Sequence, residues 1–211
     1  MTEELHRNFD KVAANWDEKP QRRQVAEAVT SAIKANIPLN AGFQVLEYGC
    51  GTGLCGLTLA SHTGHLTAAD TSAGMLEELE KKRRALGLKN VTSVLISPDS
   101  WTLPQAAYDL VFSSMVLHHI EDIPGLLQNL LKTLKPGGFL ALADLVQEDG
   151  TFHDDPTGIA HFGFDPLALI TLLGQNGLIA LESQTVHTFI KQRGENEQAY
   201  PVFLVTGQKP R

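Results

Sequence analysis

The stretch Val45-Leu-Glu-Tyr-Gly-Cys-Gly-Thr-Gly53 decides the fold of this chain. It begins as a short apolar strand, reaches an acidic residue at Glu47, and continues into three glycines at alternate positions. Glycine tolerates positive φ and leaves the peptide groups bare, so a ligand can lie against the backbone of such a loop. We therefore expect a strand, a ligand-binding loop and a helix over about residues 54–61, whose N-terminus faces an anionic group.

Two cofactor classes are bound by this kind of loop. Gly51, Gly53 and Gly56 match the G-x-G-x-x-G pattern of dinucleotide sites. An acidic residue followed by G-x-G-x-G is instead typical of S-adenosylmethionine sites, and Glu47 with Gly49, Gly51 and Gly53 completes that pattern. A tight turn without any ligand is a third interpretation. The loop alone therefore does not decide whether a ligand binds or which of the two cofactors it is.

Residues further along the chain separate the two cofactors. The predicted strand 65–70 ends in Asp70, 23 positions after Glu47, a spacing that places a carboxylate beside the ribose diol that both cofactors have. After the next predicted strand, Pro98-Asp-Ser-Trp-Thr-Leu-Pro104 resembles the G-D-A-x-x-L-P segment of class I S-adenosylmethionine-dependent methyltransferases. In that family the aspartate binds the adenine amino group and the next N–H meets the ring, which implies these roles for Asp99 and Ser100.

The resemblance continues in the family's order over residues 9–145. Residues 70–75 resemble the D-x-S-x-x-M segment, 108–113 the fourth strand, 134–138 the turn before the fifth strand, and 15–17 an N-terminal Y-D element. The chain looks most like the small-molecule branch that includes the ubiquinone and menaquinone C-methyltransferases. The resemblance implies contacts to S-adenosyl-L-methionine from Trp16, Glu47, Gly49, Gly51, Gly53, Asp70, Thr71, Met75, Asp99, Ser100, Trp101 and Ser113.

Strand-like and helical segments alternate as in a doubly wound sheet. We expect strands near 43–48, 65–70, 91–96, 108–113 and 138–145, and helices near 20–36, 54–61, 72–86, 122–134 and 166–176. Residues 178–188 and 200–207 are predicted to form a hairpin joined by the polar stretch 191–198. The resemblance implies an α/β, Rossmann-like, seven-stranded sheet that is mostly parallel, with an antiparallel C-terminal hairpin strand.

Composition agrees with one methyltransferase-sized domain. The 211 residues are 43% hydrophobic, which is enough for a single core over 1–211 and leaves little for the substrate domain of a nicotinamide enzyme. Within it we expect an N-terminal helical cap (1–40), a cofactor-binding core (41–145), and a lid loop, helix and hairpin (146–211).

Charge and hydropathy exclude several partners. The formal net charge of −7 opposes binding to nucleic acid. No apolar run has the length of a membrane span, and the first residues do not resemble a signal peptide. The two cysteines and the histidines lack zinc spacing. We therefore expect a cytoplasmic protein with a small-molecule partner, no nucleic-acid or membrane partner and no metal; the sequence leaves its oligomeric state open.

The chemistry that the resemblance implies asks mainly for positioning. The donor's sulfonium already activates the methyl group, so the protein holds the acceptor in line and keeps water away. A hydroxyl or carbon acceptor also needs a base, and histidine suits that role. His118 and His119 follow the fourth predicted strand, where the resemblance places the acceptor pocket, and are the catalytic candidates. The alternative is that either one only packs or caps a short helix.

Some acceptors are disfavoured by the same region. The chain reads Ser113-Ser-Met-Val116 where amino-group base methyltransferases carry D/N-P-P-Y/F, and it has no Pro-Cys nucleophile for cytosine C5 chemistry.

The long connection 147–165 is the most distinctive segment of this chain. Loops of this length are usually functional or disordered, and this one is rich in aromatic and ionisable residues. We interpret it as a substrate lid with His153, His161 and Phe162 as candidate substrate-binding residues. Alternatively, Phe162 and Phe164 fill the core ahead of the helix that starts at Asp165-Pro166. Asp144 is the only well-placed carboxylate near it, so a metal-dependent reaction is not expected.

Three functions remain open. The leading one is a small-molecule methyltransferase that uses S-adenosyl-L-methionine and releases S-adenosyl-L-homocysteine. The second is a non-catalytic domain that binds the same cofactor as a sensor or partner subunit. The third is a nicotinamide-dependent oxidoreductase, which does not account for Asp99 and Ser100 or for the C-terminal hairpin.

Overall fold

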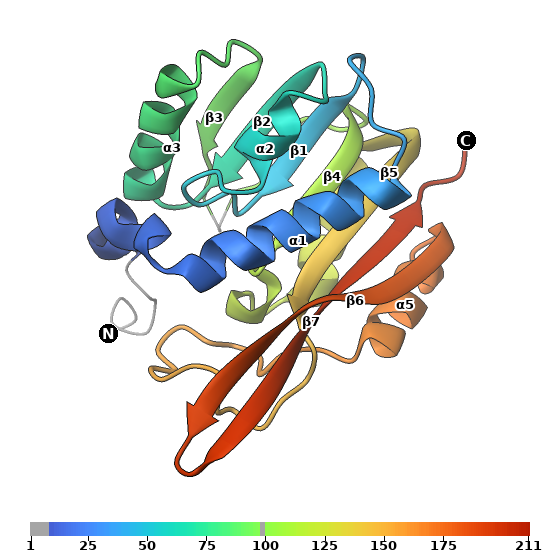
Figure 1. Cartoon of the computed structure of the whole chain (residues 1–211). Coiled ribbons are helices and arrows are strands. Elements are labelled where there is room, and N and C mark those ends of the chain that lie inside the picture. The colour runs from blue at the N-terminus through green and yellow to red at the C-terminus, as the bar shows by residue number, and fades with distance from the viewer. Residues whose placement is uncertain (1–8, 98–99) are drawn as a thin grey trace.

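A seven-stranded sheet forms the centre of the molecule (Figure 1). The computed structural model describes residues 9–97 and 100–211, and the strand order is β3-β2-β1-β4-β5-β7-β6. The first five strands are parallel, and β7 lies antiparallel between β5 and β6. The strands are β1 (Gln44–Tyr48), β2 (His65–Asp70), β3 (Val91–Leu95), β4 (Tyr108–Ser114), β5 (Leu134–Leu145), β6 (Ile179–Arg193) and β7 (Asn196–Gln208).

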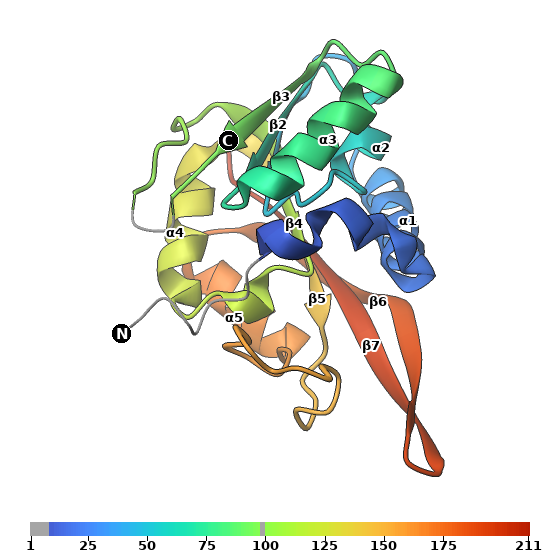
Figure 2. The ribbon, with the colours of Figure 1, turned by 90° about the vertical axis from the view of Figure 1, so that its left-hand side faces the viewer.

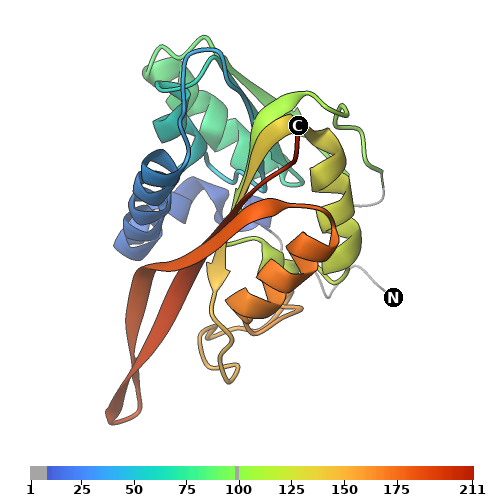
Figure 3. The ribbon, with the colours of Figure 1, turned by 90° about the vertical axis from the view of Figure 1, so that its right-hand side faces the viewer.

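Helices cover both faces of the sheet (Figures 2 and 3). On one face α1, α2 and α3 share a buried cluster with the sheet, and on the other α4 and α5 share a second one. The helices are η1 (Phe9–Glu18), α1 (Pro20–Asn36), α2 (Gly56–Ala60), α3 (Ala73–Ala85), η2 (Leu117–His119), α4 (Ile123–Thr133) and α5 (Pro166–Gln175). No helix within the described residues has the length and apolar character that crossing a bilayer requires.

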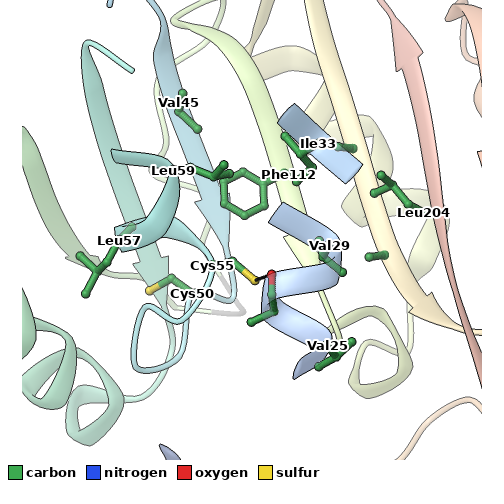
Figure 4. Packing of buried hydrophobic residues seen from close by; sticks show 14 of the residues in the cluster. Val25, Val29, Ile33, Val45, Cys50, Cys55, Leu57, Leu59, Phe112 and Leu204 are labelled. Carbon is green, nitrogen blue, oxygen red and sulfur yellow. Dashed lines mark hydrogen bonds between the residues drawn. The ribbon is translucent and has the colours of Figure 1, made fainter. Parts of the chain in front are cut away.

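The central strands read as apolar runs because both of their faces are covered. Figure 4 shows one side of this packing, where Val29 and Ile33 of α1 lie near Phe112 of β4. Cys55 belongs to the same cluster, and its thiol contacts the Ala26 carbonyl of α1 at 3.9 Å. Cys50 and Cys55 are both buried free thiols, and burial raises the pKa of each above its ordinary value.

The predicted fold class is confirmed, including the antiparallel strand inserted beside β5. The predicted polar connection at 191–198 is wrong, because β6 and β7 continue through it and turn at only two residues, Gly194 and Glu195. The hairpin projects beyond the body of the sheet (Figure 1), and Lys191 and Arg193 of β6 donate to the Phe152 carbonyl of the loop 147–165. The helix expected at 54–61 is limited to 56–60.

Candidate active site

One large cavity opens where the parallel strands end. Its volume is about 940 Å³, within the range of small-molecule and cofactor sites. Its walls come from η1 and the start of α1, from the glycine loop after β1, from the segments after β2 and β4, from the loop 147–165, and from β6. Ligands of open α/β sheets bind at this carboxyl edge of the strands. The cavity therefore lies where the sequence predicts a cofactor.

The glycines of the loop after β1 have different tasks. Gly49, Gly51 and Gly53 all have positive φ (71°, 52° and 82°), so each favours glycine. A Cβ on Gly49 would lie 2.4 Å from a Val116 side-chain carbon, whereas one on Gly51 would meet no atom within 4 Å. Gly49 and Gly51 line the cavity and Gly53 does not. The bare peptide at Gly51 is thus open to a ligand, Gly49 both lines the cavity and leaves room for Val116, and Gly53 is needed for packing and turn geometry.

Asp70 ties this loop to the next strand end. One of its oxygens accepts the Gly51 N–H at 2.6 Å and the other accepts the Ser72 N–H at 2.9 Å. Its side chain lines the cavity, and burial raises the pKa of its carboxyl despite these hydrogen bonds. Each oxygen keeps acceptor capacity. Asp70 is therefore positioned to accept hydroxyl groups from a ligand, as the sequence predicts for a ribose diol.

Glu47 is a buried carboxyl in the wall of the same cavity. It is 3% exposed, and its Oε2 atom has no hydrogen-bond partner among the described residues. Burial and the neighbouring Asp70 raise the pKa of Glu47 well above its ordinary value, although it accepts the Gly56 N–H. A buried oxygen without a donor is costly. Oε2 lies on the α2 side of Glu47, where a Cβ on Gly56 would be 2.1 Å from it.

The segment η1 is pinned at one end to the start of α3. Asp10 accepts the Ser72 hydroxyl at 2.5 Å and the Gly74 N–H at 2.8 Å. Both donors lower the pKa of Asp10, and the Ser72 hydroxyl has the larger effect. The carboxylate also stands at the positive end of the helix. Asp10 therefore holds η1 beside the cavity, where Phe9 forms part of the wall.

The other end of η1 is held by a second aspartate. Asp17 accepts the Thr52 hydroxyl of the glycine loop and pairs with Lys82 of α3, both at 2.6 Å. Next to it, Trp16 lines the cavity and carries the Arg22 guanidinium 3.4 Å from its ring centroid. The predicted N-terminal element thus closes one side of the cavity, with Arg22 in its wall.

His118 forms a buried pair with Asp144 across the far side of the cavity. Its Nδ1 lies 2.7 Å from Asp144 Oδ1, and its own backbone N–H donates to Oδ2 at 3.2 Å. Oδ1 also accepts the Leu145 N–H at 2.7 Å. Because both oxygens already act as acceptors, the imidazole proton belongs on Nδ1, and Nε2 is left as a proton acceptor. Asp144 is fully buried, so this tautomer is held in a dry environment.

The loop 147–165 docks on η2. The His118 carbonyl accepts the N–H groups of Ala160 (2.8 Å) and His161 (3.1 Å), and His119 Nδ1 donates to the Gly158 carbonyl at 2.7 Å. His119 lines the cavity and packs edge-on against Phe9, with ring centroids 5.1 Å apart. The loop and both histidines therefore form one unit.

The structure separates the predicted substrate-binding residues of this loop. His153 lines the cavity, with its ring centroid 5.1 Å from that of His118. His161 and Phe162 do not line it. The His161 imidazole binds the Ile120 carbonyl at 2.9 Å, and Phe162 is 45% exposed and packs on Gly150. For these two residues, packing of the loop itself is the role that the contacts indicate.

The predicted adenine segment lies beside the cavity. Asp99 falls outside the described residues. Ser100 and Trp101 do not line the cavity themselves, but Trp101 stacks on Tyr48, which does (centroids 5.9 Å apart). Ser113 is buried and donates to the Tyr48 carbonyl at 2.8 Å, so its contact is to the protein.

Several residues of the cavity wall were missed by the sequence analysis. They are Tyr48, Thr52, Ile96, Phe152, His187, Phe189, Lys19 and Lys191. Thr71 and Met75, which were predicted, line it. Among the described residues no cluster of three or more histidine, cysteine, aspartate or glutamate side chains is arranged to hold a metal ion.

The geometry and a family comparison agree. The family described as "Methyltransferase domain" matches residues 45–138, a segment that runs from the glycine loop through η2 and α4. Over these residues the chain is similar to methyltransferases. The donor of class I methyltransferases is S-adenosyl-L-methionine, and the bare peptide at Gly51 fits such a ligand. The predicted resemblance to the quinone C-methyltransferases stays a prediction.

Individual proteins show the same likeness. Methyltransferase GfsG of Streptomyces halstedii is 30% identical, over 69% of this chain and 52% of its own length. An O-methyltransferase of Pyrenophora dematioidea is 29% identical, over 78% of this chain and 65% of its own. The chain thus spans about half to two thirds of these relatives. A SAM-dependent methyltransferase of Aquifex aeolicus superposes with a TM-score of 0.69, at 20% identity, covering 94% of this chain and 97% of that one, and shows the fold.

Proposed function

We propose that this protein transfers a methyl group from S-adenosyl-L-methionine to a hydroxyl group of a small molecule, releasing S-adenosyl-L-homocysteine. One observation carries the proposal. A single cavity has the glycine loop and Asp70 on one side and His118, backed by the buried Asp144, on the other. Such a cavity accommodates a cofactor and an acceptor together, with a base on the acceptor's side.

The proposed cofactor contacts follow from the hydrogen-bond acceptors and the bare backbone that line one side of the cavity. Asp70 binds the ribose hydroxyls, the bare backbone at Gly51 lies against the ligand, and Glu47 forms part of the wall at the cofactor end. Thr71, Met75 and Trp16 complete the wall. The family resemblance supports an adenine contact from Asp99 and Ser100, with Trp101 acting through Tyr48. For Gly53 and Ser113 we propose a supporting role only.

His118 takes the acceptor's proton. The cofactor supplies a methyl group that is already activated, so the remaining chemical task is to remove the hydroxyl proton as the new bond forms. The neutral imidazole of His118 accepts the proton at Nε2, and Asp144 stabilises the positive charge that the imidazole then carries. His119 and His153 form the walls around the acceptor. The Pyrenophora dematioidea relative is an O-methyltransferase, which supports the choice of a hydroxyl.

The setting of the protein is part of the proposal. We propose a single domain over residues 1–211, a cytoplasmic location, a small-molecule acceptor, and no nucleic-acid or membrane partner. The acidic net charge of −7 supports the choice of acceptor.

Methyl transfer from the labelled cofactor tests the proposal. The purified protein is incubated with methyl-labelled S-adenosyl-L-methionine and a panel of phenols, enols, hydroxy acids and amines. Label is expected in the hydroxyl compounds. His118→Asn should lower transfer by about 10²–10⁴-fold, the usual share of a general base, with unchanged S-adenosyl-L-homocysteine affinity. Binding without any transfer would favour the non-catalytic sensor, and label in amines alone would refute the hydroxyl acceptor.

A further inference from the structure

We propose that the acceptor carries an anionic group, a carboxylate or a phosphate, and that Lys19 and Lys191 bind it at the mouth of the cavity. This inference rests on the proposed function and names the substrate class of the same site. Its basis is that two lysines from distant segments, one just before α1 and one on β6, line the same wall. Each lysine presents an ammonium group to this cavity, and a positively charged side chain in a cleft attracts an anion.

Lys191 is a cation held in a partly apolar place. Its Nζ atom lies 4.0 Å from the centroid of the Phe152 ring and donates to the Phe152 carbonyl at 2.5 Å. An ammonium group has three donors, and this contact uses one. Burial is the main cause that lowers the pKa of Lys191 below its ordinary value. The positive charge of protonated Lys191 is therefore incompletely compensated in the structure, and a bound anion would compensate it.

Carboxylates also lie near the two lysines. Asp154 and Glu148 raise the pKa of Lys191, whereas Arg193 and Lys19 lower it. Asp154 is also paired with Arg193 at 2.7 Å, and its side chain is 80% exposed. Asp155 lines the cavity as well, so the lysines stand among carboxylates. Within the described residues, however, no ion pair joins a carboxylate to Lys19 or Lys191. Both ammonium groups are therefore available to bind an anionic group of a ligand.

A row of rings joins the two ends of the proposed acceptor site. The ring centroid of His118 lies 5.1 Å from that of His153, which lies 4.8 Å from that of Phe152, on which Lys191 rests. Phe189 packs against Phe152 with centroids 5.2 Å apart. All of these residues line the cavity. An acceptor with a flat apolar body, a hydroxyl at His118 and an anion at the lysines matches this order of surfaces.

The alternative role for Lys191 is structural. Both Lys191 and Arg193 donate to the Phe152 carbonyl, which fastens the loop 147–165 to the hairpin. A fastening role predicts that loss of the amine destabilises the loop for every ligand alike. An anion-binding role predicts a loss that depends on the charge of the ligand. The two roles are separated by comparing ligands with and without an anionic group.

The test measures binding of paired probes to the full chain saturated with S-adenosyl-L-homocysteine. The pairs are 4-hydroxybenzoate with 4-hydroxybenzamide, and phenyl phosphate with phenol, each measured by calorimetry. We expect the wild-type protein to prefer the anion of at least one pair by about tenfold or more, as for one charge-assisted hydrogen bond. In the double variant Lys19→Gln/Lys191→Gln this preference should fall to about one, and Lys191→Arg should retain part of it.

Lys89→Gln is the matched control, because Lys89 is exposed and does not line the cavity. An anion preference that survives in the double variant overturns the inference, as does equal binding of both members of each pair. Failure to bind any probe in a protein that binds S-adenosyl-L-homocysteine also overturns it, while the cofactor site stands. Failure to bind S-adenosyl-L-homocysteine itself refutes the proposed function instead. The two arms show whether the anion is a carboxylate or a phosphate.

Discussion

Replacing Asp144 by asparagine tests whether the buried pair acts in catalysis. The amide keeps the size of the carboxylate and removes its charge. We expect its NH₂ group to face the His118 backbone N–H, because that sacrifices the longest contact (3.2 Å) and keeps the two at 2.7 Å. The Nδ1 proton of His118 then retains an acceptor, but a neutral one.

The size of the effect follows from that exchange. Hydrogen bonds to charged groups contribute about 1.5–3 kcal/mol and neutral ones about 0.5–1.5 kcal/mol. A difference of about 1–1.5 kcal/mol in the stabilisation of the imidazolium corresponds to a fall in kcat of about tenfold. The buried N–H that loses its acceptor should lower the free energy of unfolding by about 1–3 kcal/mol. Affinity for S-adenosyl-L-homocysteine should not change, because Asp144 does not line the cavity.

Single-turnover methyl transfer, calorimetric binding and urea unfolding measure these three quantities. Asp109→Asn is the matched control, since Asp109 also accepts a backbone N–H and pairs with Lys135 but lies outside the cavity wall. A transfer rate for Asp144→Asn within twofold of the wild type, with His118→Asn equally active, would refute the role of the pair as a base. A tenfold loss of cofactor affinity would show that Asp144 mainly supports the cofactor end.

Three further results are expected. Gly51→Ala should abolish measurable cofactor binding and lower the free energy of unfolding by about 1–2 kcal/mol, the cost of positive φ. Gly49→Ala should unfold at a clearly lower urea concentration than Gly51→Ala, because its Cβ meets a valine side chain at 2.4 Å. Equal unfolding midpoints of the two variants would contradict this. Burial raises the pKa of Glu47 well above its ordinary value of 4.5, so ionisation of this carboxyl above pH 4.5 lowers the stability of the fold. Glu47→Gln should therefore gain stability relative to wild type as the pH rises above 4.5; a pH-independent difference would count against it. Asp10 has a lowered pKa, so its contribution to stability is present above about pH 3.8 and is lost as the pH falls further. The fluorescence of Trp16, measured in a variant whose other tryptophan is phenylalanine, should change in that pH window. The same change should be absent when Asp10→Asn is added.

The parts that depend on local sequence could be predicted. The glycine loop, Asp70 at the end of β2 and the parallel strands follow from short patterns whose meaning does not depend on distant contacts. The length of the β6–β7 hairpin could not, because its polar end is held by contacts with a distant segment, such as those of Lys191 and Arg193 with the Phe152 carbonyl. The connection at 191–198 was predicted because polar residues were interpreted as a loop.

The acceptor end depends on contacts between distant segments. Asp144 is 26 residues from His118, and only the sheet brings them together, so the sequence showed a candidate base without its partner. Lys191 reaches the cavity because β6 runs past the loop 147–165. Nothing in the residues around 191 signals this. His161 and Phe162 looked like their neighbour His153 in sequence, but the loop turns them away from the cavity.

The most direct test of the central claim is calorimetric titration of the purified protein with S-adenosyl-L-methionine, S-adenosyl-L-homocysteine and NADH, with Asp70→Ala and Asp109→Ala in parallel. We predict that the first two ligands bind, that NADH does not, and that only Asp70→Ala abolishes binding. Binding of NADH alone, or cofactor affinity that is unchanged in Asp70→Ala, would contradict the assignment of the cavity and of every residue placed in it.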